Sequence, residues 1–227
     1  VTVNVAPNAL PTGANGSATI NEDGSYALQL VDFGYADADA TQTLAAVRID
    51  ALPGLGTLTL NGTPITAGTV VTAADIAAGR LVMTPAANAS GTPYTSFTFS
   101  VQDSFGDFAA TPGTFSLNVT AVNDAPVATN TSVSTSPMTP LDIDVRAGAS
   151  DVEDGSANLT VTIISASAGT TASVNPDGTI HFEPGTTSGP QTVVYTVTDS
   201  NGLSSAPASV TVNVAPNALP TGANGSA

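Results

Sequence analysis

The chain contains no cysteine, no tryptophan and no lysine, and its only histidine is His181. Without cysteine it has no disulfide bond, no thiolate zinc site and no thiol nucleophile. A serine nucleophile would have to pair with His181, which we expect to be a structural strand residue, and no G-x-S-x-G turn is present. Paired carboxylates for glycoside hydrolysis would need a cleft with aromatic platforms, yet only 5% of the residues are aromatic. These absences argue against an enzyme.

Positive charge is also scarce. Three arginines stand against 18 acidic residues, and the formal net charge is −15. Such a charge argues against binding to nucleic acid or to an anionic membrane surface, because these partners carry the same sign. No apolar run approaches the about 18 residues of a membrane span, so direct membrane insertion is not expected. No signal peptide is visible, and any export signal or anchor is expected elsewhere in a longer polypeptide.

The acidic residues are almost all of one kind, with 15 Asp and three Glu. Asp forms turns and is a short oxygen ligand, whereas an acidic surface that only interacts with water usually carries many Glu. An exported protein without disulfides needs another stabiliser, and calcium serves this purpose in many extracellular modules. The composition therefore favours Ca²⁺ as a bound ion.

Residues 1–18 (VTVNVAPNALPTGANGSA) recur letter for letter as residues 210–227, an offset of 209 residues. A stretch repeated without change at both ends, with no copy between, is typical of one period of a tandem array plus an overlap. Arrays of this kind serve as stalks or spacers, because each added unit adds length. We therefore expect the partners of this unit to be neighbouring repeats of the same polypeptide, in which it remains monomeric.

Short alternating runs predict the secondary structure. Runs with apolar residues on one face cover residues 96–101, 114–119, 192–197 and 210–214. Only residues 73–78 (AADIAA), ended by Gly79, predict a turn of helix. Many short strands separated by turn signals predict an all-β sandwich protein.

A second, degenerate repeat divides the chain. Residues 99–106 (FSVQDSFG) align with residues 195–202 (YTVTDSNG), and Asp103 and Asp199 are 96 residues apart, the length of one sandwich domain. Residues 1–10 are predicted to hold the last strand of a preceding repeat and a connector. Residues 11–122 and residues 123–214 are the two predicted domains, and residues 215–227 form a connector that begins the next repeat.

Several short motifs are similar to those of one protein family. Residues 122–126 (VNDAP), 149–155 (ASDVEDG) and 175–184 (NPDGTIHFEP) resemble the junction, acidic loop and hairpin of bacterial cadherin-like and Ig-like tandem repeats in large calcium-dependent surface adhesins of the RTX type. Residues 21–24 (NEDG) resemble a sister cadherin-like type. The resemblance implies two Ig-like or cadherin-like β-sandwich domains arranged end to end.

In this family the matching positions hold Ca²⁺ between consecutive domains. The resemblance implies a central site whose ligands come from the first strand of the upper domain, the connector and two loops of the lower domain: Glu22, Asn123, Asp124, Asp151, Glu153 and Asp199. Two carboxylates about 5 Å apart repel by about 3 kcal/mol at an effective dielectric constant near 20, so a converging set needs a cation. The alternative interpretation is that these Asp residues only form turns.

A second, weaker site is expected at the N-terminal junction, at Asp37, Asp39, Asp103 and Asn8. The connector that faces these acids has no acid of its own, since Asn8-Ala9 stands where Asn123-Asp124 stands in the other connector. The first strand of the second domain likewise ends in residues 136–138 (SPM) where the first domain has Glu22. We therefore expect the central junction to bind calcium first.

The leading hypothesis from the sequence is a structural extender. One repeat of a large bacterial surface adhesin, stiffened by Ca²⁺ at its junctions, would project a distal ligand-binding domain from the cell. The alternative is a module of the same fold that binds a glycan or protein directly. Either function predicts a secreted, cell-surface location and no enzymatic activity.

Overall fold

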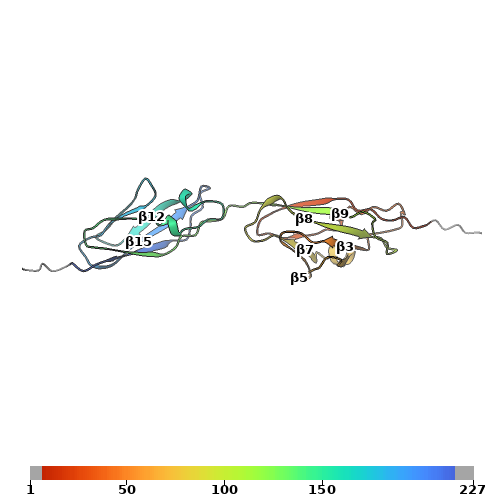
Figure 1. Ribbon diagram of the computed structural model, residues 1–227, viewed down its shortest axis with the longest axis horizontal. Helices are drawn as coiled ribbons and strands as arrows, with labels where there is room; N and C mark the ends of the chain where they lie inside the picture. Colours follow the sequence, from red (N-terminus) through yellow and green to blue (C-terminus); the bar gives the residue numbers. More distant parts are fainter. Residues whose placement is uncertain (1–6, 218–227) are drawn as a thin grey trace, which may run out of the picture. The chain divides into compact units, whose positions relative to one another are not determined.

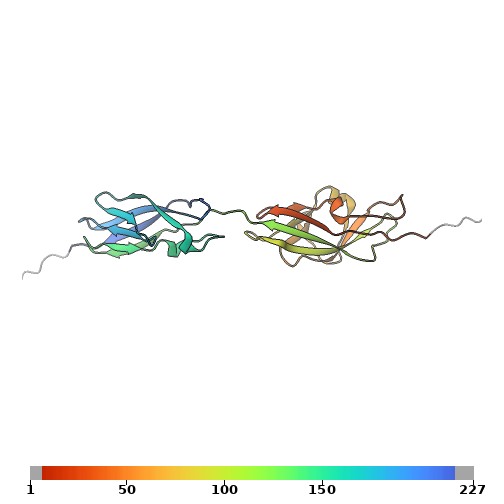
Figure 2. The ribbon, with the colours of Figure 1, turned by 90° about the horizontal axis from the view of Figure 1, so that it is seen from above.

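A computed structural model of the chain describes residues 7–217, which divide between Val122 and Asn123 into two compact units (Figures 1 and 2). The strand expected at residues 1–5 and the connector residues 218–227 lie outside the described part. Each unit is a β-sandwich, so the predicted all-β fold is confirmed. No helix in residues 7–217 has the length and apolar character needed to cross a membrane.

The first unit pairs a five-stranded sheet with a four-stranded one. The larger sheet, in the order β1-β9-β8-β3-β6, consists of β1 (Gly16–Asn21), β3 (Ala46–Ala51), β6 (Val70–Thr72), β8 (Gly91–Gln102) and β9 (Gly113–Thr120). The smaller sheet, in the order β2-β7-β4-β5, consists of β2 (Tyr26–Ala27), β4 (Thr57–Leu60), β5 (Thr63–Pro64) and β7 (Leu81–Thr84). Two short helices complete the unit, η1 (Leu30–Phe33) and the predicted turn α1 (Ala73–Ala77).

The core of the first unit follows from the alternation read in the sequence. Phe97, Phe99 and Val101 of β8 are all buried, because residues two apart on a strand point to the same face. Their neighbours on β9 are buried in the same way, and leucine and methionine side chains of β4 and β7 close the core from the other sheet. Phe33 of η1 meets Phe99 edge to face at a centroid distance of 4.9 Å.

The second unit has a four-stranded and a three-stranded sheet. The first, in the order β10-β16-β15-β12, consists of β10 (Thr131–Thr135), β12 (Thr160–Ala166), β15 (Gly189–Thr198) and β16 (Ala208–Val214). The second, in the order β11-β14-β13, consists of β11 (Leu141–Ile143), β13 (Thr171–Val174) and β14 (Ile180–Glu183). Two short helices, η2 (Arg146–Gly148) and η3 (Ser156–Asn158), lie between β11 and β12.

The largest fully buried side chain of this core is Tyr195 on β15. Its hydroxyl donates a 2.7 Å hydrogen bond to the carbonyl of Thr129, so the one polar atom of the ring is satisfied. Alternating valines of β15 and β16 pack around it, and Ile180 and Phe182 of β14 close the core from the other sheet. Burial raises the pKa of Tyr195, which keeps this hydroxyl a neutral donor.

In both units the first strand runs parallel to the last one, β1 with β9 and β10 with β16. The first strand and the last strand therefore finish at the same end of each unit, the end where the chain leaves. The segment by which the chain enters lies at the other end, where it forms an isolated bridge, Thr12 with Ala36 and Val127 with Ser150. This topology brings residues distant in sequence together at each end.

Candidate metal sites

The N-terminal end of the second unit is made of three segments. The entering segment carries Asn123 and Asp124, the loop after Ser150 carries Asp151 and Glu153, and the β15–β16 turn carries Asp199. The Val127–Ser150 bridge holds the first segment against the second. The third is closed by a bridge between Thr198 and Ser204.

Asp199 organises the turn that it begins. It is buried, and its Oδ1 accepts hydrogen bonds from the backbone N–H groups of Asn201 (2.9 Å) and Leu203 (2.8 Å). Its Oδ2 accepts a 2.6 Å bond from the amide of Asn123. Burial alone would raise the pKa of Asp199, but these donors outweigh it and lower that pKa below its ordinary value. The side chain is therefore a carboxylate at neutral pH.

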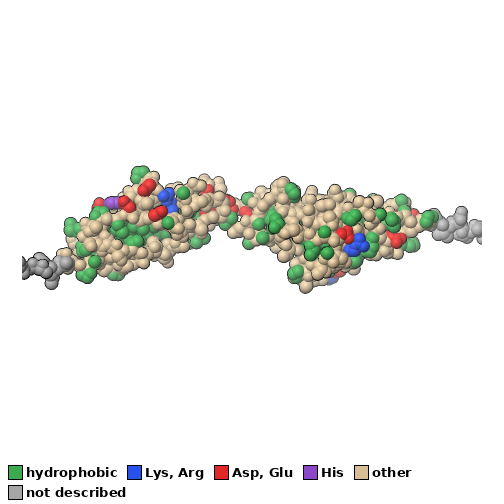
Figure 3. Space-filling view, viewed as in Figure 1, with side chains coloured by type: hydrophobic (Ala, Val, Ile, Leu, Met, Phe, Trp, Pro, Cys, Tyr) green, Lys and Arg blue, Asp and Glu red, His purple; other side chains and the backbone are tan. Residues whose placement is uncertain are grey.

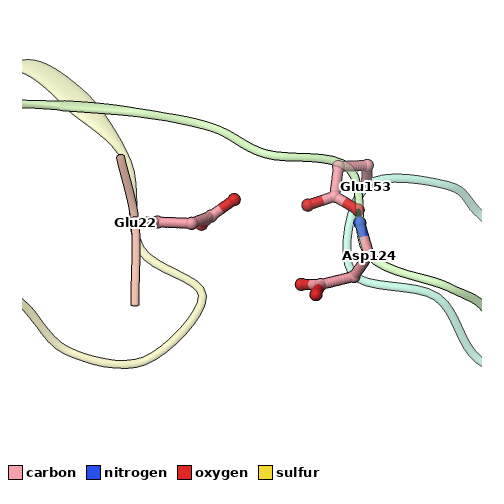
Figure 4. Close-up of side chains that lie close together, drawn as sticks. All are labelled: Glu22, Asp124 and Glu153. Carbon is pink, nitrogen blue, oxygen red and sulfur yellow. Dashed lines mark hydrogen bonds between the residues drawn. The ribbon is translucent and has the colours of Figure 1, made fainter. Parts of the chain in front are cut away.

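Asp124, Asp151 and Glu153 form the second half of this cluster, and Figure 4 draws the side chains of Asp124 and Glu153. The backbone N–H of Asp124 donates to Glu153 at 3.2 Å, and the backbone N–H of Glu153 donates to Asp151 at 3.1 Å. Asp151 also accepts a 2.7 Å bond from the N–H of Asp154, whose carboxylate binds the N–H of Ser200. One carboxylate oxygen each of Asp124 and Asp151 is hidden from solvent and has no donor among the described residues. Such an oxygen is costly to bury unless a cation or water satisfies it.

Glu22 belongs to the C-terminal end of the first unit, where it directly follows β1. It is buried, and its Oε1 accepts a 2.6 Å hydrogen bond from the backbone N–H of Val122, the last residue of that unit. Its own N–H donates to the carbonyl of Thr120, which continues the β1–β9 ladder. Val122 is followed in the chain by Asn123, so Glu22 is anchored beside the start of the connector.

The N-terminal end of the first unit has the same construction. Asp103 is buried, its Oδ1 accepts 2.9 Å bonds from the N–H groups of Phe105 and Asp107, and its Oδ2 accepts a 3.1 Å bond from the Asn8 amide. Burial would raise the pKa of Asp103, but these hydrogen bonds lower it below the ordinary value. Asn8 also donates to the carboxylate of Asp107 at 2.9 Å.

Asp37 and Asp39 complete the first unit's cluster. The N–H of Asp39 donates to Asp37 at 2.8 Å, and the N–H of Ala9 donates to Asp39 at 2.8 Å. The hydroxyl of Tyr35 donates to Asp37, and burial together with this carboxylate raises the pKa of Tyr35 to about 12. The amide of the buried Gln42 bonds to Asn8 and Asp39.

The two N-terminal clusters correspond residue by residue, because each pair occupies the same place in the same hydrogen-bond pattern. The corresponding pairs are Asn8 and Asn123, Ala9 and Asp124, Asp37 and Asp151, Asp39 and Glu153, and Asp103 and Asp199. The structure thus brings the expected residues of each N-terminal end together within their own unit. The first unit lacks only the acid that Asp124 adds in the second.

Three members of these clusters were not predicted. Asp107 is not among the ligands expected from the sequence, yet its carboxylate accepts a hydrogen bond from the Asn8 amide. Asn201 donates a 2.6 Å hydrogen bond to the amide oxygen of Asn123 and occupies the turn position of Phe105. The D-S-F-G-D spacing could have indicated Asp107, whereas no local pattern distinguishes Gln42, which joins its cluster only through tertiary contacts.

All the available side-chain ligands of these clusters are oxygen atoms from carboxylates and amides. Such a donor set suits a hard cation that accepts six to eight oxygens in flexible geometry, and it suits Ca²⁺ better than Mg²⁺, which demands a strict octahedron. Soft metals that need sulfur or imidazole have no ligand here. The donor-free oxygens of Asp124 and Asp151 are the atoms most in need of such an ion.

His181 lies away from these clusters, on β14, among acidic side chains. Its Nδ1 is 2.7 Å from the Asp142 carboxylate on β11 and its Nε2 is 3.5 Å from Glu183 (Figure 3, purple beside red). The hydrogen bond to Asp142, supported by Glu183, raises the pKa of His181, and it lowers the pKa of Asp142. The position agrees with a structural strand residue.

The raised pKa of His181 predicts a pH dependence of stability. The folded pKa exceeds the unfolded value of about 6.5, so the stabilisation is fully present below that pH and is lost as the pH rises through the folded pKa. We expect the second unit to melt a little lower at pH 8.5 than at pH 5.5. His181→Gln should abolish the difference in a melting series, and an unchanged slope in that variant would contradict the assignment.

Comparison with known proteins finds a family model that is similar to the second unit. Residues 123–216 match the family model of the bacterial cadherin-like domain. No curated protein sequence matches the chain.

Solved structures with a similar fold include human mucin-like protocadherin EC1-2, which is 16% identical with a TM-score of 0.46 over 91% of this chain and 98% of that one. The protocadherin gamma-B4 extracellular domain is 18% identical with a TM-score of 0.44 over 90% of this chain and 35% of that chain. An endo-fucoidan hydrolase of glycoside hydrolase family 107 is 19% identical with a TM-score of 0.33 over 92% of this chain and 29% of that chain. None of these likenesses assigns a function or a site. The family model covers less than half of the chain, and the two-sheet architecture of the second unit agrees with a cadherin-like fold.

Proposed function

We propose that the chain is a non-catalytic extender repeat of a large extracellular bacterial adhesin of the RTX type. The observation that carries the proposal is the acidic cluster at the N-terminal end of the second unit, which is repeated in the first. A cadherin-like fold and oxygen-only clusters beside the connectors support an adhesion or spacer module more than an active site.

We propose further that Ca²⁺ binds the cluster of the second unit and stiffens its connection to the first. Asn123, Asp124, Asp151, Glu153 and Asp199 would supply ligands from one side. Glu22, anchored on Val122 next to the connector, would supply a ligand from the other. The ion would offset the repulsion among the carboxylates, which otherwise favours an open arrangement.

The alternative function is direct binding of a glycan or protein. It would need an exposed aromatic platform, and the described residues expose Phe105 as a single large aromatic side chain. The charge also disfavours acidic partners.

Small-angle scattering tests the extender function. We expect the maximum dimension of the particle to be larger in millimolar calcium than in excess chelator, and the distribution of end-to-end lengths in the ensemble to be narrower, because bound ions restrict bending at the connector. Magnesium at the same concentration serves as the control for charge screening. Scattering curves that superimpose in calcium, magnesium and chelator would refute calcium stiffening.

A further inference from the structure

Phe105 is an exposed aromatic residue at the end where the chain enters the first unit. It is 75% exposed, and it lies in the turn between β8 and β9 that Asp103 organises. Asn8 of the entering segment bonds to Asp103 and Asp107 on either side of it. The ring therefore lies beside the point at which a preceding repeat would connect.

Met138 is the corresponding apolar residue at the end where the chain leaves the second unit. It is 74% exposed and lies in the turn after β10, held by a hydrogen bond from Thr139 N–H to the Ser136 carbonyl. β10 ends beside the last residue of β16, since Thr135 pairs with Val214. A surface hollow opens at this turn, lined by Met138, Pro140, Glu183, Pro184, Gly185 and Thr186.

The positions equivalent to Phe105 and Met138, at the N-terminal end of the second unit and the C-terminal end of the first, are polar. Asn201 replaces Phe105 in the second unit and bonds back to Asn123. Asp23 replaces Met138 in the first unit. Both residues have a left-handed backbone (φ 58° and 55°) in the same turn, and Asp23 accepts a hydrogen bond from the N–H of Asn88. The apolar pair thus occurs only at the two ends that a repeat boundary would join.

The repeated sequence indicates that the end of the second unit with Met138 meets the end of the next repeat with Phe105. Residues 215–217 (Ala-Pro-Asn) are identical to residues 6–8, so Asn217 of one repeat is Asn8 of the next. Two residues, Ala215 and Pro216, separate Val214 from Asn217, and the three peptide steps between them span at most about 10 Å. The Met138 hollow of one repeat and Phe105 of the next therefore flank one short connector.

On the leaving side, this boundary also lacks a counterpart of Glu22, the acid that directly follows the first strand of the first unit. By the strand register, Ile20 beside Val119 corresponds to Thr135 beside Val214, which places Pro137 at the position of Glu22. Pro137 offers no carboxylate, and Pro216 in the connector has no N–H to donate.

We propose that consecutive repeats dock through an apolar contact in which Phe105 of the following repeat packs against Met138 in the hollow of the preceding second unit. The inference rests on the tandem arrangement of the proposed function but not on calcium. Aromatic rings and the methionine thioether attract each other, and the contact removes two exposed apolar side chains from water.

The test uses a chain of two consecutive repeats, residues 1–227 followed by residues 19–227, labelled with ¹³C-methyl methionine and kept in chelator. Each repeat has two methionines, Met83 at 1% exposure in the core and Met138 at its surface. We expect the Met138 methyl of the first repeat to shift upfield under the Phe105 ring. It should also react several-fold more slowly with peroxide than Met138 of the second repeat, which has no follower.

Phe105→Asn in the second repeat introduces the residue found at Asn201 and should abolish both effects. The same substitution in the first repeat is the matched control and should change neither. The Met83 methyl reports that the fold is intact. The proposal would be overturned by two Met138 methyls that behave as in the single repeat, by effects that survive the second-repeat substitution, or by a shift that depends on protein concentration. A failure of calcium to stiffen the chain would leave this result unaffected.

Discussion

In the presence of calcium we expect the second unit to melt at a higher temperature, and a variant carrying Asp124→Asn, Asp151→Asn and Asp199→Asn to lose most of that rise. Extracellular modules bind Ca²⁺ with dissociation constants of about 10⁻⁴–10⁻³ M. At a free calcium concentration of about 100 times the dissociation constant, binding stabilises the folded state by about 2.7 kcal/mol. For a domain of this size each kcal/mol shifts the melting temperature by about 4–8 °C.

Asparagine is chosen because its amide oxygen still accepts the hydrogen bonds that Asp199 receives from its own turn. The matched control is Asp142→Asn, Asp144→Asn and Asp177→Asn, which removes the same charge from acids of the same unit outside the cluster. Calorimetric melts with calcium and with chelator measure both variants. If the cluster variant responds to calcium as the parent does, the ligand assignment is wrong.

The second large effect does not need calcium. We expect Asp103→Ala to destabilise the first unit by about 2–5 kcal/mol, because the buried Asp103 carboxylate accepts hydrogen bonds from two backbone N–H groups and the Asn8 amide, and losing a hydrogen bond to a charged group costs about 1–3 kcal/mol. Urea unfolding in chelator should show a lower midpoint with an unchanged slope.

Asp107→Ala is the matched control, because this exposed side chain contributes one hydrogen bond to the same Asn8 amide. We expect it to cost much less than Asp103→Ala. Asp103→Asn should fall between them, since it keeps an acceptor for the turn but loses the charge. Equal midpoints for the two alanine variants would show that Asp103 does not organise this end of the unit.

The strands and their inward faces were predictable from local sequence. Phe97, Phe99 and Val101 alternate with small polar residues, and a period of two places such residues on the face that packs against another sheet. The α1 turn was also predictable from local sequence, because Gly79 follows it, and the structure adds that the side-chain oxygen of Thr72 caps its start. The short 3₁₀ helices η1, η2 and η3 have no such periodicity and were not predicted.

The types of residue at the candidate sites were also predictable, since short motifs around Asp151 and Asp199 indicated them. What each carboxylate does was not. Asp103 lies 95 residues from Asn8 in the sequence, and the parallel pairing of first and last strands sets where the two meet. The same holds for Gln42, whose neighbourhood carries no site signal.

Local sequence was therefore enough to predict an all-β, acidic, cysteine-free repeat with oxygen ligands concentrated in its loops, because composition and periodicity are local properties. The packed structure was needed to show that Asp107 and Asn201 belong to the clusters, that Pro137 is the one of residues 136–138 that matches Glu22, and that Phe105 and Met138 lie at the two ends that flank the repeat boundary. These assignments depend on strand register, and register is set by the packing of both sheets on their core rather than by any short stretch of sequence.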